Sequence, residues 1–316
     1  MKETVLVTGG AGYIGSHTAV ELIQAGFDVV IADNLSNSDL QAVEGVRRIT
    51  GAEVPFEQID CCDLQAMRRL FERHEFRSVI HFAASKAVGE SVAEPLKYYR
   101  NNLLSFLNVV ELMCDFGRPN ILFSSSCTVY GEPDAQPVTE QTPRKPATSP
   151  YGNTKQISED ILRDAVAAHP GLRGIALRYF NPIGSHPSAL IGELPRGVPQ
   201  NLVPYVTQTA AGIRECLSIF GNDYPTPDGT CIRDYIHVQD LVEAHLLALD
   251  WLLQGKASTA FNLGNGHGFS IREVIHAVET VTGQRVTVQD LPRRAGDPAI
   301  LVADSTRARA ALGWQP

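Results

Sequence analysis

Short apolar runs alternate with helix-length segments through the first 180 residues, and this alternation restricts the fold more than any other feature of the chain. Runs that are apolar on both faces and joined by helices are typical of a parallel sheet covered on both sides. The sequence therefore predicts an α/β fold built on a doubly wound parallel sheet. Its expected helices lie near 12–25, 64–74, 95–116 and 150–169. Its expected strands are "TVLVT" (4–8), "DVVIAD" (28–33), "EVPFEQID" (53–60), "SVIHFAA" (78–84), "NILFSSS" (120–126) and "GIALRYF" (174–180).

The composition changes at Asn181. Residues 181–232 are rich in proline, glycine and asparagine, which suits a smaller, loop-rich lobe over the strand ends. Helical patterns return near 238–254 and 270–282, with "TAFNLGN" as an expected strand between them. We therefore expect two domains, 1–180 and 181–316, with some later segments returning to the first.

Net charge and hydropathy argue against several classes of partner. The chain carries a formal charge of −8 and no long run of lysine or arginine, which disfavours nucleic acid and anionic membranes as main partners. An anionic small ligand remains compatible, because local amides and a few arginines can outweigh the global sign. No apolar run approaches the ~20 residues that span a bilayer. The opening "MKETVLVTGG" lacks the apolar region and cleavage site of a signal peptide and is expected to form a strand.

The cysteines and histidines form no metal-binding pattern. The six cysteines show neither paired C-x-x-C spacing nor a cysteine–histidine zinc arrangement, and no H-E-x-x-H is present. We expect reduced thiols in a cytoplasmic protein without a bound metal.

A glycine-rich turn follows the first expected strand directly. "VLVTGGAGYIGSH" contains G-x-x-G-x-x-G through Gly9, Gly12 and Gly15 and opens a helical pattern. Glycines here allow a tight turn and let a pyrophosphate approach the backbone at the helix N-terminus. Asp33 ends the second apolar run, where a carboxylate accepts hydrogen bonds from the adenosine ribose and repels a 2′-phosphate. The pattern predicts a dinucleotide site that prefers NAD to NADP.

A second motif, "SPYGNTK", places Tyr151 and Lys155 four positions apart at the start of a helical pattern. Ser149 is a good N-cap and Pro150 suits the first helical position. The tyrosine and lysine are therefore expected on one helix face, with Cβ atoms about 6 Å apart. Alone, this spacing is also that of an ordinary polar stripe on a surface helix. It becomes informative together with the glycine motif.

With both motifs in one chain, the sequence resembles the extended short-chain dehydrogenase/reductase family, whose members contain a Rossmann-type domain. The resemblance to the UDP-glucose 4-epimerase family within it runs from Thr8 to about Asp304. Members usually continue past the equivalent of "LGWQP" into another helix. The stretches that carry the resemblance are "DNLSNS", "VIHFAASKAVGES", "YYRNN", "SSSCTVYG", "LRYFNPIGSHPSA", "IFGNDYPTPDGTCIRDYIHVQDL" and "RRAGDP".

The resemblance implies reversible epimerisation of UDP-glucose and UDP-galactose at carbon 4, through a transient 4-keto sugar and tightly bound NAD. It makes Tyr151 the general base, with Ser126 orienting the sugar hydroxyl and Lys155 bonding the nicotinamide ribose. A free phenol with a pKa of about 10 is only ~0.1% ionised at neutral pH, so a pKa near 7 requires about 4 kcal/mol of preferential phenolate stabilisation. Lys155 and the positive nicotinamide ring are expected to supply it.

The resemblance also implies the binding residues. Two arginines suit a diphosphate because guanidinium forks fit phosphate oxygens. The expected NAD site comprises Gly9, Gly12, Tyr13, Ile14, Gly15, Asp33, Asn34, Asp60, Cys61, Phe82, Ala83, Lys86, Asn101, Tyr151, Lys155 and Phe180. The expected UDP-sugar site comprises Ser126, Tyr151, Asn181, Asn201, Leu202, Phe220, Arg233, Arg294, Asp297 and Leu301.

Substrate range and assembly are expected from the same resemblance. Leu301 aligns with a position that walls the sugar pocket near its 2-substituent and that holds tyrosine in some members and a small residue in others. A leucine predicts UDP-glucose and UDP-galactose as main substrates, with weaker epimerisation of the N-acetylhexosamine forms. The helices expected at 95–116 and 150–169 resemble the pair that forms the family's homodimer interface. The residues expected at its dry centre are Leu103, Leu104, Leu107, Val110 and Ile161.

Two departures from the family and two alternative functions accompany this interpretation. Cys127 replaces the more usual alanine after Ser126, and Ala84 replaces a common glycine. Cys127 is either a thiol in the cleft or an inert core cysteine. A sugar-nucleotide 4,6-dehydratase shares fold and cofactor but needs an Asp-Glu pair where this chain has Cys127 and Thr128. A non-catalytic NAD sensor typically lacks the tyrosine or the lysine, and both are present.

Overall fold

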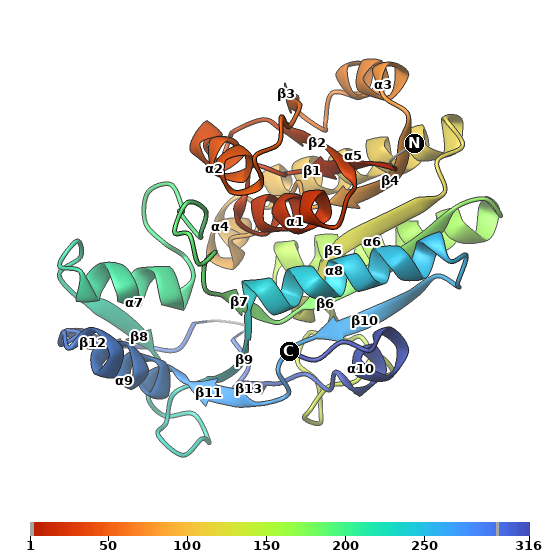
Figure 1. The fold of residues 1–316 in the computed structure, drawn as a ribbon. Helices are drawn as coiled ribbons and strands as arrows, with labels where there is room; N and C mark the ends of the chain where they lie inside the picture. Colours follow the sequence, from red (N-terminus) through yellow and green to blue (C-terminus); the bar gives the residue numbers. More distant parts are fainter. Residues whose placement is uncertain (1–2, 295–296) are drawn as a thin grey trace.

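A seven-stranded sheet forms the centre of the computed structural model, which describes residues 3–294 and 297–316. The strand order is β10-β6-β5-β4-β1-β2-β3, and every neighbouring pair is parallel. The prediction of a doubly wound parallel sheet is confirmed (Figure 1). The strands are β1 (Thr4–Thr8), β2 (Asp28–Asp33), β3 (Phe56–Gln58), β4 (Phe76–His81), β5 (Asn120–Ser126), β6 (Arg173–Tyr179) and β10 (Thr259–Leu263).

Helices cover both faces of this sheet and enclose two apolar cores. Alternate residues of a strand point to opposite faces, so Val5 and Val7 of β1 belong to one core and Leu6 to the other. This is why the central strands are apolar throughout. The first core is covered by α1 (Tyr13–Gln24), α2 (Leu40–Thr50) and α8 (Val238–Leu253). The second is covered by α3 (Leu64–Arg73), α5 (Pro95–Asp115) and α6 (Pro150–Ala168).

The strand order reverses between β1 and β4. In doubly wound sheets, ligands bind beyond the carboxyl ends of the strands at such a point. Thr8 pairs with His81, and Ser126 pairs with Tyr179. The segments that follow these four strand ends therefore share one edge of the sheet.

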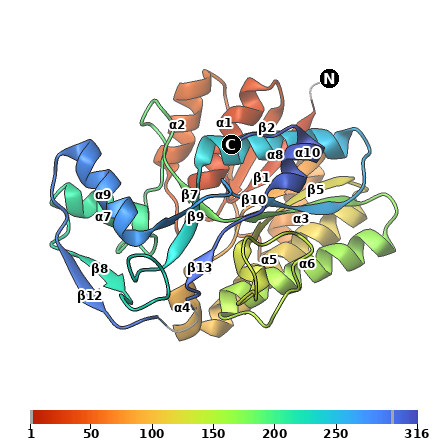
Figure 2. The ribbon, with the colours of Figure 1, turned by 90° about the horizontal axis from the view of Figure 1, so that it is seen from below.

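The remaining elements form a smaller part beside this edge (Figure 2). Strands β11, β9, β13 and β7 make one small sheet, β12 pairs with β8, and α7 packs against α9 around a separate apolar core. In contrast, α8 and β10 lie beyond residue 180 but belong to the large sheet and its cover. The strands of the smaller part are β7 (Asn181–Ile183), β8 (Leu217–Phe220), β9 (Ile232–His237), β11 (Gly268–Ser270), β12 (Val288–Leu291) and β13 (Ile300–Leu301). The remaining helices are α4 (Val88–Ala93), α7 (Leu202–Ala210), α9 (Ile271–Thr282) and α10 (Thr306–Leu312).

Several details differ from the sequence-based expectation. The predicted strand at 53–60 contributes only three residues to β3, which is an edge strand and follows Pro55, a residue without an amide donor. Helix α2 was not predicted, although Asp39 caps it by accepting from the Gln41 amide and Gly51 ends it in the left-handed conformation. Helices α4, α7 and α10 were also missed; they have only six, nine and seven residues, too few for a clear apolar period.

The apolar residues expected at a dimer centre differ in their burial. Leu104 and Leu107 on α5 are exposed, at 39% and 44%. Val110 instead packs into the core between α5, α6 and the sheet, so its predicted place at an interface is wrong. Leu103 and Ile161 are partly buried, and their place at an interface stays a prediction. Within the described ranges, no helix is both long and apolar enough to cross a bilayer.

Candidate active site

The glycine-rich turn between β1 and α1 has no side chain at Gly9, Gly12 and Gly15. We call these three positions the glycine cradle. Gly9 has φ +69°, and a Cβ added there would lie 2.7 Å from the Ala83 amide nitrogen after β4. A Cβ at Gly15 would overlap the Gly9 carbonyl oxygen. Gly12 is the N-cap of α1 and offers no side-chain cap, and the first turn carries no acidic residue. The first amides of α1 are therefore free of side-chain partners and suit a pyrophosphate, so the residues present fit a dinucleotide.

Asp33 lies beside this cradle at the end of β2. It is 7% exposed, and its carboxylate accepts hydrogen bonds from the Ala11 amide at 3.1 Å, the Leu35 amide at 2.9 Å and Ser38 Oγ at 2.7 Å. These donors hold the carboxylate at the carboxyl edge, next to the position where an adenosine ribose is expected. The neighbouring Asn34 donates to Asp60 at 3.4 Å, which places these two predicted residues side by side.

Other predicted cofactor residues surround the same edge. Tyr13 donates its hydroxyl to the Gly184 carbonyl at 2.7 Å, and Asn101 Nδ2 lies 3.4 Å from Ser85 Oγ. Ile14 and Phe82 pack against the first core, and Ala83 packs against the second. Cys61 is buried, and its carbonyl accepts from Asn108 at 2.9 Å. Cys61 can therefore contribute only backbone or apolar contact to a ligand.

The predicted catalytic residues meet where β5 and α6 approach each other. Ser126 ends β5, and its side chain accepts from the Thr128 amide at 3.2 Å. Ser149 caps α6 by accepting from the Gly152 amide at 3.1 Å, so Tyr151 and Lys155 lie in the first turns, as predicted. Lys155 is 4% exposed. Its Nζ donates to the Ser124 carbonyl at 2.5 Å and lies 5.8 Å from the centroid of the Tyr151 ring.

Burial controls the ionisation of this pair. It raises the pKa of Tyr151 to about 12, although a hydrogen bond with Ser126 opposes the shift. It also lowers the pKa of Lys155 to about 7, against the charge of Glu159. In the protein alone, burial therefore disfavours the charged forms of both side chains. The expected lowering of the tyrosine pKa by Lys155 together with a positive nicotinamide ring stays a prediction.

Two predicted residues for the UDP-sugar, Arg233 and Asp297, form an ion pair. Arg233 Nη2 lies 2.5 Å from Asp297 Oδ1, with 13% of the arginine side chain exposed. Register places Arg233 of β9 opposite Leu301 of β13. Leu301 is 6% exposed and shares a buried cluster with Cys127 and Phe180. The cluster joins the end of β5 to the smaller part of the molecule. Leu301 is therefore buried near the end of the strand that carries Ser126.

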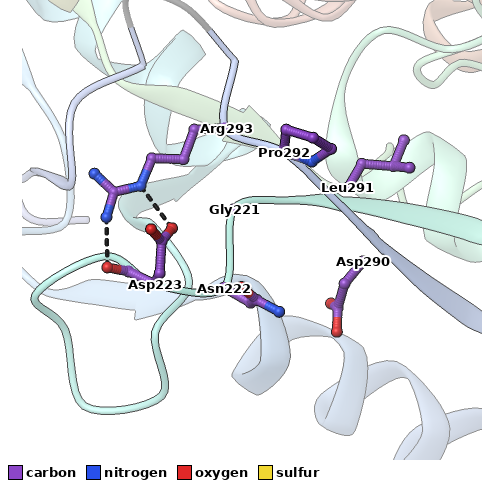
Figure 3. Close-up of a pocket in the computed structure, with 7 residues that line it drawn as sticks. All are labelled: Gly221, Asn222, Asp223, Asp290, Leu291, Pro292 and Arg293. Atoms are coloured by element: carbon purple, nitrogen blue, oxygen red, sulfur yellow. Dashed lines mark hydrogen bonds and ion pairs between the residues drawn. The ribbon is translucent and has the colours of Figure 1, made fainter.

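Phe220 and Arg294 form a second, more exposed group. The guanidinium carbon of Arg294 lies 3.8 Å from the centroid of the Phe220 ring. Their neighbours in the sequence, Gly221 and Arg293, line a pocket of about 330 Å³. In this pocket Arg293 donates to the Asp223 carboxylate at 2.7 Å (Figure 3). This pocket contains none of the predicted catalytic residues. Its lining residues are Gly221, Asn222, Asp223, Asp290, Leu291, Pro292 and Arg293.

Glu193 is a site residue that sequence reasoning missed. Its carboxylate lies 2.9 Å from Lys86 Nζ and accepts from Asn201 Nδ2 at 2.6 Å, with 9% of its side chain exposed. It thus joins a predicted cofactor residue to a predicted substrate residue. Asn181 in β7 and Leu202 at the start of α7 lie on the same connection between the two parts. No motif marks Glu193, because it lies in a loop and its partner Lys86 is 107 residues away in the sequence.

Comparisons with known proteins agree with this arrangement. The model of the NAD dependent epimerase/dehydratase family matches residues 5–264. UDP-glucose 4-epimerase of Bacillus subtilis is 51% identical over 311 residues, which cover 98% of this chain and 91% of that protein. The crystal structure of UDP-glucose 4-epimerase from Bifidobacterium longum in complex with NAD+ and UDP is 47% identical, covers 99% of this chain and 93% of its own, and has a TM-score of 0.96. UDP-glucose 4-epimerase from Stenotrophomonas maltophila, with bound NAD and formylated UDP-arabinopyranose, is 50% identical with the same coverage and a TM-score of 0.95.

The chain belongs to the NAD-dependent epimerase/dehydratase family. Within that family it is similar over nearly its whole length to UDP-glucose 4-epimerases, and the predicted resemblance is confirmed.

Proposed function

We propose that this chain is an NAD-dependent UDP-glucose 4-epimerase, which interconverts UDP-glucose and UDP-galactose. The observation that carries the proposal is the meeting of Ser126, Tyr151 and Lys155 at the carboxyl edge of the sheet that also holds the glycine cradle. Relatives that are about half identical and bear this name support it. We assign NAD to the part up to residue 180 together with α8 and β10, and the UDP-sugar mainly to the remainder.

In the proposed mechanism, the glycine turn and Asp33 would hold NAD, which when bound would supply the hydride acceptor and donor for carbon 4 of the sugar. Tyr151 takes the proton of the carbon-4 hydroxyl as the hydride leaves, which produces a 4-keto sugar. Ser126 donates a hydrogen bond to that oxygen, and Lys155 stabilises the tyrosinate. The keto sugar rotates while its UDP stays bound. Tyr151 then gives the proton back to the carbon-4 oxygen as the opposite face of the keto sugar is reduced, and the two hydride transfers would cancel, so the reaction has no net oxidation.

We assign the diphosphate to Arg233 and Arg294, whose guanidinium groups suit phosphate oxygens. Asp297 orients Arg233, since the two form an ion pair. Holding the substrate by its UDP leaves the sugar without a fixed orientation, and epimerisation requires that freedom.

Weaker epimerisation of the N-acetylhexosamine forms is part of the proposal. Leu301 is shorter than tyrosine and packs beside Cys127 at the strand end that carries Ser126. It offers no hydrogen bond to an amide, so discrimination rests on volume and is limited to about 1–3 kcal/mol per small group. We also propose a homodimer, in which exposed Leu104 and Leu107 on α5 are covered, and a cytoplasmic location, which suits six unpaired cysteines.

The proposal is tested by incubating the purified protein with UDP-galactose, without added reductant, and measuring UDP-glucose. Conversion is expected, and Tyr151→Phe is expected to lower turnover by about 100-fold or more while NAD stays bound. A keto-deoxy product would support a dehydratase instead. Tight NAD retention without conversion would support a sensor. A Tyr151→Phe variant with near wild-type turnover would show that Tyr151 is not the base.

A further inference from the structure

A buried ionic network lies directly behind the catalytic helix. Glu159 is on α6 one turn beyond Lys155, with 7% of its side chain exposed. Its carboxylate accepts from Arg178 Nε at 2.9 Å, Arg178 Nη2 at 2.7 Å and Ser125 Oγ at 2.6 Å. Arg178 also donates to the Tyr130 hydroxyl at 2.8 Å. The two-pronged pairing fixes the carboxylate more firmly than a single contact would.

The network joins α6 to the strand that carries the catalytic serine. Ser125 lies between Ser124, whose carbonyl accepts from Lys155, and Ser126. Because side chains alternate along a strand, Ser125 points to the α6 side while its neighbours point to the other face. Ser125 is also the register partner of Arg178. Glu159 therefore contacts β5 and β6 at the level where Lys155 meets β5.

Glu159 also affects the protonation of Lys155. Burial lowers the pKa of Lys155, and the charge of Glu159 raises it. The other titratable groups at this place are uncharged at neutral pH: burial lowers the pKa of His81 on β4 to about 3 and raises those of Tyr151 on α6 and Tyr179 on β6. The cations Arg178 and Arg144 face the carboxylate itself, at 2.7 and 3.6 Å.

We propose that Glu159 is a positioning residue for the reaction, which fixes α6 against the end of β5 through Arg178 and Ser125 and places a negative charge one turn below the Lys155 ammonium. Without that charge, Lys155 loses its proton at lower pH and supports the tyrosinate less. The inference rests on the proposed function, since turnover is one of its readouts.

The test is the substitution Glu159→Gln, which keeps the size and removes the charge. Turnover of UDP-galactose at neutral pH is expected to fall by about tenfold or more, with KM within about twofold, because the ground-state contacts to UDP are untouched. The alkaline limb of the turnover–pH profile is expected to move to lower pH. Independently of turnover, the pKa of the Lys155 amine, followed by the chemical shifts of its side chain against pH, is expected to be lower in Glu159→Gln than in the wild type.

Three further variants separate charge from packing. Glu159→Asp keeps the charge and is expected to keep the wild-type position of the alkaline limb. Ser125→Ala removes one hydrogen bond and is expected to lower turnover slightly without moving the limb. The double variant Glu159→Gln/Arg178→Gln avoids an unpaired buried guanidinium, which would itself be destabilising. Its alkaline limb is expected to lie at lower pH than that of the wild type, as in Glu159→Gln.

Two results would contradict the inference in different ways. If Glu159→Gln and the double variant lower turnover equally at every pH and leave the Lys155 titration unmoved, Glu159 is only a structural residue. If both variants match the wild type, it has no role in the reaction. A wild type that does not convert UDP-galactose would instead overturn the proposed function, so the two failures are distinguishable.

Discussion

Replacement of Gly15 by alanine tests whether the glycine cradle holds NAD by close backbone approach. The added Cβ would overlap the Gly9 carbonyl oxygen and lie 2.7 Å from Gly10 Cα. Both are backbone atoms of the turn and cannot rotate away, so α1 must move back from the end of β1. Overpacking of this kind typically costs about 1–3 kcal/mol. The movement also withdraws the first amides of α1 from the pyrophosphate, and a lost charged hydrogen bond adds about 1.5–3 kcal/mol.

The overpacking cost acts on the protein with and without NAD, so the binding loss is that of the hydrogen bond, about 1.5–3 kcal/mol, or roughly 10- to 100-fold weaker NAD binding. The molar ratio of NAD to protein after gel filtration, followed by NAD titration of the stripped protein, measures it. Gly89→Ala is the matched control: Gly89 lies in α4, and an added Cβ meets nothing within 4 Å. It is expected to retain NAD as the wild type does. A Gly15→Ala variant with wild-type NAD affinity would refute the argument that the cradle needs glycine at this position.

Four further predictions follow from the structure. Burial lowers the pKa of His81 to about 3 and of His245 to about 4. Below about pH 6.5 the unfolded chain binds these two protons and the folded chain does not. Each histidine should therefore reduce the free energy of unfolding by about 1.4 kcal/mol per pH unit as the pH falls from about 6.5 toward 4. Denaturant unfolding that gives equal stability at pH 7 and 5 would contradict this. Burial raises the pKa of Cys127 to about 11, so iodoacetamide at neutral pH should leave turnover unchanged; rapid inhibition that UDP prevents would show an accessible thiol instead. Leu301→Tyr should lower kcat/KM for UDP-N-acetylgalactosamine relative to UDP-galactose, and an unchanged ratio would remove Leu301 as the gate. Leu107→Glu should convert a dimer into a monomer in sedimentation at micromolar concentration, whereas a monomeric wild type would exclude the interface.

The sequence was sufficient to predict features that depend on neighbouring residues. The continuous apolar runs and the helical patterns between them predict the large sheet and most of its covering helices, because strands buried on both faces are apolar throughout. Ser149 and Pro150 predict the start of α6, and the i and i+4 spacing then places Tyr151 and Lys155 on one face. The glycine turn likewise carries its own conformational requirement. Short helices such as α4 and α10 give no comparable local signal.

Only the tertiary structure decides how distant segments change each other's chemistry. Glu193 meets Lys86 and Asn201 from a loop whose pattern is unremarkable, and Val110 turns to the internal core rather than to an interface. The ionisation of the catalytic pair could not be predicted either. A spacing of four residues indicates proximity, but the pKa values of Tyr151 and Lys155 depend on how completely the strands and helices around them exclude water. Desolvation is a property of the whole packed environment, and no local sequence pattern records it.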